Sequence, residues 1–314
     1  GLEENPNDAP KLAQFYAQRA AAGVALIVTG GISPNKQGVL LPHAATLISE
    51  SQLATHQLVT NAVHQQGGKI ALQILHTGRY SYQPNLVAPS AIQSPITPFM
   101  PKAMSHEQIE QTINDYIHCA QLAQKAGYDG VEIMGSEGYL INQFLVRYTN
   151  QRDDQWGGNI ENRCRFALRI LEGIKKTVGE PFIIIYRLSM LDLIKDGAEA
   201  SEVLYLAKAI EKAGATMINT GIGWHEARIP SIATMVPRGQ FANVTRKLMG
   251  KLNIPLITSN RINTPQTAEA ILAEGCADMV SMARPFLADP EFVLKAQQGR
   301  EDEINTCIAC NQAC

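Results

Sequence analysis

The chain lacks a long hydrophobic run, a cluster of basic residues and a recognisable leader. Its 314 residues carry 27 Lys and Arg against 29 Asp and Glu, a net charge of -2. No window approaches the roughly 18 consecutive apolar residues of a membrane span, and no basic run indicates nucleic-acid binding. The first residues, Gly1-Leu-Glu-Glu-Asn-Pro, include no initiator Met and no signal-peptide pattern. We therefore expect a cytoplasmic protein with no membrane or nucleic-acid partner, cut at its N-terminus.

Seven short apolar runs alternate with helical patterns along the chain. Their continuous rather than alternating apolarity predicts buried parallel strands joined by helices such as 202–213. Three predicted helices end at a glycine that leads straight into the next strand: Gly127, Gly214 and Gly275. The predicted strands cover residues 24–29, 69–75, 130–134, 182–187, 216–220, 255–258 and 278–282.

Two architectures accept this alternation, an open doubly wound sheet and a closed (βα)8 barrel. The open sheet should carry a glycine-rich phosphate loop, yet neither G-x-G-x-x-G nor a Walker sequence occurs, and Gly221-Ile-Gly223 lacks the third glycine. A barrel should instead place polar residues after its strands, as in His76-Thr-Gly-Arg79 and Trp224-His-Glu-Ala-Arg228. We therefore predict a TIM (β/α)8 barrel over residues 1–300, with its first strand upstream of Gly1.

Cysteine is scarce, and half of it lies at one end. Cys119, Cys164 and Cys276 are scattered and are expected to pack in the core. The other three form Cys307-Ile-Ala-Cys310-Asn-Gln-Ala-Cys314, a spacing typical of a zinc site or an iron–sulfur cluster. Both usually take four ligands, so we expect residues 301–314 to begin a metal segment that continues beyond this sequence.

Three arginines follow predicted strands, namely Arg187, Arg261 and Arg284. Guanidinium groups bind phosphate with bidentate geometry, and the last two occupy the loops where barrels often hold a phosphate. The pattern predicts a phosphate-bearing cofactor. The alternative is that each arginine pairs with a carboxylate of the barrel.

Tyr139 and His225 are the candidate acid–base residues. Tyr139 lies in a Gly-flanked turn after a strand, where it could donate a proton, although a lone tyrosine is more often part of the core or the rim. His225 follows a strand and a Gly-x-Gly turn, and histidine commonly exchanges protons near neutral pH. His76 could equally be structural.

Four motifs in order resemble the old yellow enzyme family of FMN-dependent ene-reductases. They are Gln73-Ile-Leu-His-Thr-Gly-Arg79, Glu137-Gly-Tyr-Leu-Ile-Asn-Gln-Phe144, Thr149-Asn-Gln-Arg-Asp-Asp-Gln-Trp-Gly-Gly158 and Glu161-Asn-Arg-Cys-Arg-Phe166. With the segment 221–230 and the terminal cysteines, the resemblance narrows to the bacterial 2,4-dienoyl-CoA reductase branch. Glu137 stands where simpler ene-reductases have histidine, which fits that branch better.

The resemblance implies a role for each matching residue. Tyr139 would be the proton donor, and His225 would support it or orient the thioester. Arg152 and Arg228 would be partners for the charge of an acyl-CoA, and three cysteines would ligate a [4Fe-4S] cluster. The residues implied to contact FMN are Gly31, Gln73, Arg187, Arg261, Ala283 and Arg284. The residues implied to line the substrate site are Thr149, Asn150, Gln151, Arg152, Glu226, Ala227, Arg228 and Ile229. The implied cluster ligands are Cys307, Cys310 and Cys314.

The implied activity is NADPH-dependent reduction of 2,4-dienoyl-CoA in fatty acid β-oxidation. Hydride would come from FMN, and electrons would reach it through the cluster from an FAD- and NADPH-binding domain beyond this sequence. Two alternatives remain within enzymes, a trimethylamine dehydrogenase-like protein and an enoate reductase. A third, from another class, is a zinc-binding structural module with a catalytically empty barrel.

Overall fold

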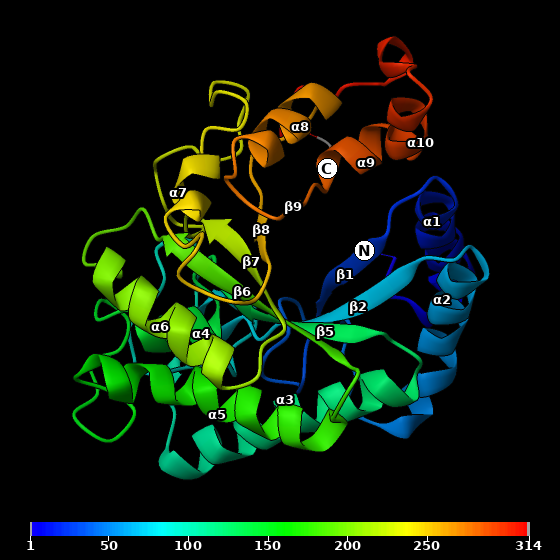
Figure 1. Cartoon of the computed structure of the whole chain (residues 1–314). Coiled ribbons are helices and arrows are strands. Elements are labelled where there is room, and N and C mark those ends of the chain that lie inside the picture. The colour runs from blue at the N-terminus through cyan, green and yellow to red at the C-terminus, as the bar shows by residue number, and fades with distance from the viewer. Residues whose placement is uncertain (1, 313–314) are drawn as a thin grey trace.

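Seven parallel strands form one curled sheet in the computed structural model, which describes residues 2–312 (Figure 1). Their order in the sheet is their order along the chain, with every neighbouring pair parallel. A doubly wound sheet would reverse its strand order at a switch point, so the barrel prediction is confirmed. The strands are β1 (Leu26–Ile32), β2 (Lys69–Ile74), β5 (Gly130–Gly135), β6 (Ile183–Leu191), β7 (Met217–Ile222), β8 (Leu256–Thr258) and β9 (Met279–Val280). Within the described part of the chain, β1 and β9 are the two edges of this sheet.

Helices cover the outer side of the sheet, with α3, α5 and α6 along one side and α1 and α2 beside β1 and β2 (Figure 1). The α-helices are α1 (Ala9–Ala21), α2 (Leu53–Gln65), α3 (His106–Lys125), α4 (Leu140–Leu145), α5 (Ile160–Val178), α6 (Ala200–Lys212), α7 (Ala242–Arg246), α8 (Pro265–Ala273), α9 (Arg284–Ala288) and α10 (Phe292–Gln297). Short 3-10 helices occupy Pro6–Asp8, Glu50–Gln52, Gly78–Tyr80 and Glu301–Glu303.

Helix α5 shows how the sequence sets these boundaries. The Asn159 side chain accepts a hydrogen bond from the backbone N–H of Asn162 and caps the first turn. The helix ends at Gly179, whose φ of 66° is a conformation that glycine adopts without strain. The three predicted glycine stops behave in the same way, because Gly127, Gly214 and Gly275 all have positive φ.

Two local features differ from the sequence prediction. A second, two-stranded parallel sheet joins β3 (Val87–Ala88) to β4 (Lys102–Ala103), and two-residue strands carry too little pattern to be read from sequence. Strand β6 continues to Leu191, beyond the predicted end at residue 187. The prediction that Cys119, Cys164 and Cys276 pack inside the protein is confirmed, since all three are buried.

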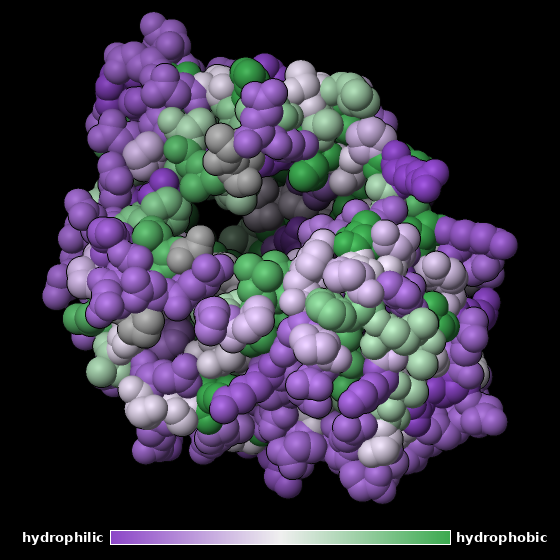
Figure 2. Space-filling view, turned by 180° about the vertical axis from the view of Figure 1, so that it is seen from behind, coloured by the Kyte–Doolittle hydropathy of each residue, from purple (hydrophilic) through white to green (hydrophobic). Residues whose placement is uncertain are grey.

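Among the described residues, no helix has the length and apolarity needed to cross a lipid bilayer. Seen from behind, the surface is hollowed near its middle, and hydrophobic residues gather on part of the rim (Figure 2). A cavity of about 220 Å³ lies between β1 and the helices α1 and α2 and is lined by residues such as Thr29, His56 and Tyr128. None of the predicted site residues lines that cavity.

Candidate active site

Tyr139 and His225, predicted from separate motifs, meet at the end of the barrel. Tyr139 follows β5 at the start of α4, His225 follows β7, and the phenol oxygen lies 2.8 Å from His225 Nε2. Burial, with a further contribution from the Glu137 carboxylate, raises the pKa of Tyr139 above its ordinary value. His225 is exposed as a residue, but partial desolvation of its imidazole lowers the His225 pKa, and Glu137 partly opposes this. The pair therefore favours a neutral phenol beside a neutral imidazole at neutral pH.

An ion pair lies next to these two residues. Arg187, from β6, contacts Glu137 with Nη2 2.9 Å from Oε1. Burial opposes the positive charge of Arg187, but the carboxylates of Glu137 and Glu132 outweigh it and raise the Arg187 pKa. Glu137 has a φ of 55°, a conformation uncommon for residues other than glycine. For Arg187, the alternative that it pairs with a barrel carboxylate is thus what the structure shows.

A polar group lies inside the barrel, next to Gly31. The amides of Gln73 and Asn219 donate to the two oxygens of Glu132 at 2.7 Å and 2.8 Å, and Glu132 is only 1 % exposed. Gly31 is the register partner of Gln73, and a Cβ on Gly31 would lie 2.7 Å from a Leu75 methyl and 3.2 Å from the Gln73 amide oxygen. The glycine thus keeps the β1 backbone open beside the polar group.

Arg261 and Arg284 lie on the β8–β9 side. Among residues 2–312, neither of them forms a salt bridge. Burial, followed by the positive charges of Arg284 and Arg238, lowers the pKa of Arg261. Arg261 Nε donates to the Val236 carbonyl at 2.8 Å. Ala283 is exposed and caps the N-terminus of α9, which Arg284 begins. Two cations that lack a carboxylate partner within residues 2–312 suit an anionic group.

Glu226 belongs to a buried cluster that the sequence analysis did not identify. Its carboxylate accepts from Arg79 Nη2 at 2.6 Å and from the Tyr80 hydroxyl at 2.8 Å. The side chains of Arg79 and Glu226 are 0 % and 5 % exposed. The guanidinium lies within 5.2 to 5.8 Å of three ring centroids, those of Tyr148, Tyr80 and Trp224. The ion pair joins the loop after β2 to the loop after β7.

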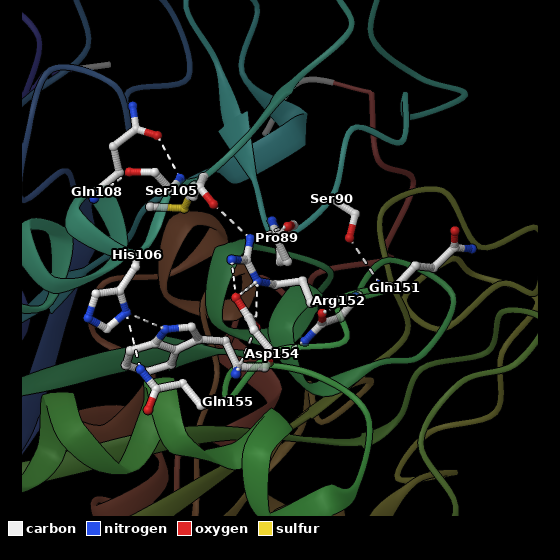
Figure 3. Close-up of polar contacts among 12 residues, drawn as sticks. Pro89, Ser90, Ser105, His106, Gln108, Gln151, Arg152, Asp154 and Gln155 are labelled. Carbon is white, nitrogen blue, oxygen red and sulfur yellow. Dashed lines mark hydrogen bonds and ion pairs between the residues drawn. The ribbon is translucent and has the colours of Figure 1, made fainter.

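The loop after α4 holds the other predicted substrate residues, of which Figure 3 shows Gln151 and Arg152. Thr149 and Asn150 are buried and donate to backbone carbonyls of α4, and Asn150 also donates to the Trp156 carbonyl in the loop. Gln151 is exposed, and its backbone N–H donates to Ser90 Oγ. Arg152 donates to the carbonyls of Pro89 and Met104 and forms an ion pair with Asp154. The Arg152 guanidinium thus donates to groups of the protein itself.

The remaining predicted positions are more open. Ala227 is partly exposed, and Arg228 and Ile229 are exposed on the loop that leaves Glu226. By contrast His76, which the sequence left undecided, is fully buried, and its Nδ1 accepts from the Gly78 N–H at 3.1 Å. Burial lowers the pKa of His76 to about 3, which fits a structural histidine.

The cysteine segment lies against the loops after β7 and β8. Asn263 Nδ2 donates to the Cys307 carbonyl at 2.7 Å, and the Thr234 hydroxyl donates to the Ala309 carbonyl at 3.0 Å. Cys307 is partly exposed and Cys310 is exposed. Cys314 lies outside the described residues. Within the described residues, no three His, Cys, Asp or Glu side chains are grouped as metal ligands, so the predicted cluster stays a prediction.

Asp192, Asn142 and Glu132 are functional candidates that sequence reasoning missed. Asp192 is buried just beyond β6 and accepts from the Trp224 indole N–H at 2.7 Å. The predicted strand stopped at residue 187, which placed Asp192 in a loop away from any strand end. A correct end at Leu191 would have marked it as a residue of the barrel mouth.

Comparison with known proteins gives a consistent result. A sequence profile described as the NADH:flavin oxidoreductase / NADH oxidase family matches residues 1–303. A metal reductase of Desulforamulus reducens is 38% identical over 100% of this chain and 48% of its own length. A 2-naphthoyl-CoA reductase in complex with 2-naphthoyl-CoA superposes with a TM-score of 0.94 at 33% identity, over 97% of this chain and 49% of that chain.

A shorter relative has the same barrel. The old yellow enzyme homologue of Zymomonas mobilis superposes with a TM-score of 0.77 at 30% identity, covering 92% of this chain and 82% of that one. The chain thus spans most of a single-barrel relative but about half the length of the curated relatives it matches.

Proposed function

The chain belongs to the NADH:flavin oxidoreductase / NADH oxidase family, and we propose that it is the substrate-reducing barrel of a 2,4-dienoyl-CoA reductase. Family membership indicates a flavin-dependent oxidoreductase with FMN as cofactor. The single observation that carries the proposed reaction is the Tyr139 hydroxyl, held 2.8 Å from His225 Nε2 at the end of the barrel.

The residues present fit FMN in two respects. In the described part of the chain, Arg261 and Arg284 are cations without a carboxylate partner, as a phosphate requires. Gly31 leaves space beside the Gln73 amide, where a Cβ would collide with neighbouring side chains, and Gln73 has the donors and acceptor that a ring carbonyl or nitrogen can use. Arg187 and Ala283 complete the proposed contacts. When bound, FMN supplies the hydride.

Tyr139 is proposed to donate the proton. A phenol with an ordinary pKa is already protonated at neutral pH, burial raises the Tyr139 pKa further, and the hydrogen bond to His225 fixes the position of the hydroxyl. Hydride addition at the far end of the conjugated diene leaves negative charge near the thioester. The O–H bond of Tyr139 then breaks as a C–H bond forms, and proton transfer from a positioned acid contributes about 10²- to 10⁴-fold in rate. His225 stabilises the resulting phenolate.

The CoA thioester is the proposed substrate class. It is supported by the resemblance of the motifs and by the likeness to a reductase described in complex with 2-naphthoyl-CoA. Arg228 and Ile229 are exposed beside the site and are proposed to contact the acyl-CoA. Thr149, Asn150, Gln151 and Arg152 are proposed to shape the opposite wall, because their hydrogen bonds hold the loop after α4 in place.

Replacing Tyr139 with Phe in the full-length FMN-loaded enzyme tests this function. We expect turnover of 2,4-dienoyl-CoA to fall about 10²- to 10⁴-fold, with FMN content unchanged. Tyr205→Phe is the matched control, since Tyr205 is 39% exposed on α6, one of the helices on the outer side of the sheet (Figure 1). Unchanged dienoyl-CoA turnover in Tyr139→Phe would rule out the assignment, and turnover of trimethylamine instead would identify an amine dehydrogenase.

We further propose that residues 1–300 form the barrel and that 301–314 begin an iron–sulfur segment. Cys307, Cys310 and Cys314 are the proposed ligands, and an FAD- and NADPH-binding domain would supply electrons in the whole protein. The metal reductase and NADH oxidase relatives, about half of whose length this chain covers, support this division. Metal and sulfide analysis of the full-length protein tests it: we expect iron with acid-labile sulfide, whereas zinc without sulfide would contradict it.

A further inference from the structure

We propose that Asp192 is a positioning residue that holds the side chains of Tyr139 and His225 in a fixed position relative to each other. The proposal rests on the proposed role of Tyr139 as proton donor. Asp192 lies just beyond the end of β6, between the strands that carry the two residues, and is 4% exposed. It touches neither of them, and it acts through one hydrogen-bonded arm toward each.

The first arm runs through Trp224 to His225. Asp192 Oδ1 accepts from the Trp224 indole N–H at 2.7 Å, and the Asp192 backbone carbonyl accepts from the Trp224 backbone N–H at 2.9 Å. Trp224 is 3% exposed, so the indole has little freedom to move. Because His225 is the next residue, two hydrogen bonds to Asp192 fix the start of the turn that carries the imidazole.

The second arm runs through Asn142 to Tyr139. The Asn142 side-chain amide donates to Asp192 Oδ1 at 3.3 Å, and its oxygen accepts from the Gly138 backbone N–H at 3.1 Å. Gly138 has a φ of 84° and immediately precedes Tyr139. A Cβ on Gly138 would lie 2.7 Å from the Trp224 indole. The two arms therefore also pack against each other.

The carboxylate that joins the arms is itself fixed. The Ser189 hydroxyl donates to Oδ1 at 2.7 Å and the Ala198 backbone N–H donates to Oδ2 at 2.7 Å. Oδ1 thus collects three donors, which an ionised carboxylate accepts more strongly than a neutral group. Among the residues described, no Lys, Arg or His forms an ion pair with Asp192.

Loss of this carboxylate would let the two turns relax independently. A displacement of about 1 Å in a catalytic group can cost roughly 10²-fold in rate. The effect should appear more in kcat than in KM, because the arms end at Gly138 and Trp224, next to Tyr139 and His225, whereas Arg228 and Ile229 lie farther along the exposed loop. The Asp192→Ala protein should therefore bind substrate and FMN normally but protonate slowly.

The test compares Asp192→Ala, Asp192→Asn and Ser189→Ala in the full-length FMN-loaded protein. We expect kcat to fall about 10²-fold for Asp192→Ala, less for Asp192→Asn, which keeps one acceptor oxygen, and least for Ser189→Ala. Ser189→Ala removes one donor to the same oxygen and leaves both arms in place. The second readout is the pKa of His225, followed by NMR of labelled histidine. It should rise toward the ordinary value of about 6.5 in Asp192→Ala only, as the imidazole leaves its site beside Tyr139, Glu137 and Arg187.

An Asp192→Ala protein with wild-type kcat and an unchanged His225 pKa would overturn the proposal. If that variant does not fold, Trp224→Phe keeps the test open, since it replaces the indole by a smaller ring without the N–H donor to Asp192 and should shift the His225 pKa in the same direction. The NMR readout does not depend on the substrate. A shifted His225 pKa in Asp192→Ala together with normal turnover in Tyr139→Phe would therefore reject the proposed reaction and retain the positioning role of Asp192.

Discussion

The two sides of the barrel mouth treat charge in opposite ways. On the β5–β7 side, Arg187 pairs with Glu137, and Arg79 pairs with Glu226 in a buried cluster. On the β8–β9 side, Arg261 and Arg284 lie near each other, and among residues 2–312 they form hydrogen bonds to carbonyl and amide oxygens only. On the first side the positive charges are neutralised by carboxylates of the protein. On the second side the positive charges remain available to an anionic ligand.

This difference indicates two roles, the positioning of side chains on the first side and the binding of an anion on the second. Paired and buried charges hold side chains in one arrangement, as proton transfer at Tyr139 requires, because a buried ion pair is costly to break. Unpaired cations repel one another, and an anion between them relieves that repulsion. The first side is thus built for orientation and the second for binding.

The largest expected effect is on protein stability and concerns the ion pair between Arg79 and Glu226 on the first side. Glu226→Ala removes the carboxylate and leaves the fully buried Arg79 guanidinium without its charge partner. Removing one member of a buried pair typically costs about 3 to 5 kcal/mol, so we expect a fall of that size in the free energy of unfolding, measured by urea denaturation. Glu226→Gln should lose less, since its amide oxygen can still accept from Arg79 and Tyr80.

An exposed ion pair gives the matched control for this prediction. Glu110 pairs with Arg169 at 2.9 Å, but the two side chains are 32% and 46% exposed. Surface pairs contribute about 0 to 1 kcal/mol, so Glu110→Ala should change stability little. Equal losses in Glu226→Ala and Glu110→Ala would show that the buried cluster is not special.

The sequence predicted the strands better than the contacts between their ends. All seven strand positions follow from apolar runs, and Gly127, Gly214 and Gly275 mark helix ends because only a positive φ suits those turns. The pairing of Arg79 with Glu226 could not be predicted, since the partners lie 147 residues apart and either could equally face solvent or substrate.

The same limit applies to the arginines. Arg187, Arg261 and Arg284 look alike in sequence, as polar residues that follow a strand, and pairing with a carboxylate was the alternative reading of each. The structure separates them. Glu137 adopts a left-handed backbone conformation and pairs with Arg187. Within the described chain, no carboxylate reaches Arg261 or Arg284. Local pattern places a residue at the mouth, whereas its partner depends on the path of a neighbouring loop.

A smaller effect is expected on FMN affinity and concerns Arg261 on the second side. Arg261→Met should weaken FMN binding about 10- to 100-fold, because hydrogen bonds to charged groups contribute about 1.5 to 3 kcal/mol. Riboflavin has no phosphate, so its affinity for the same variant should stay unchanged. Binding is measured by quenching of flavin fluorescence in the flavin-free protein, with Arg169→Met as the control that removes an exposed, paired arginine. Arg261 also has a φ of 60° and holds the Val236 carbonyl. An equal loss for FMN and riboflavin would therefore mean that Arg261 shapes the loop and does not bind phosphate.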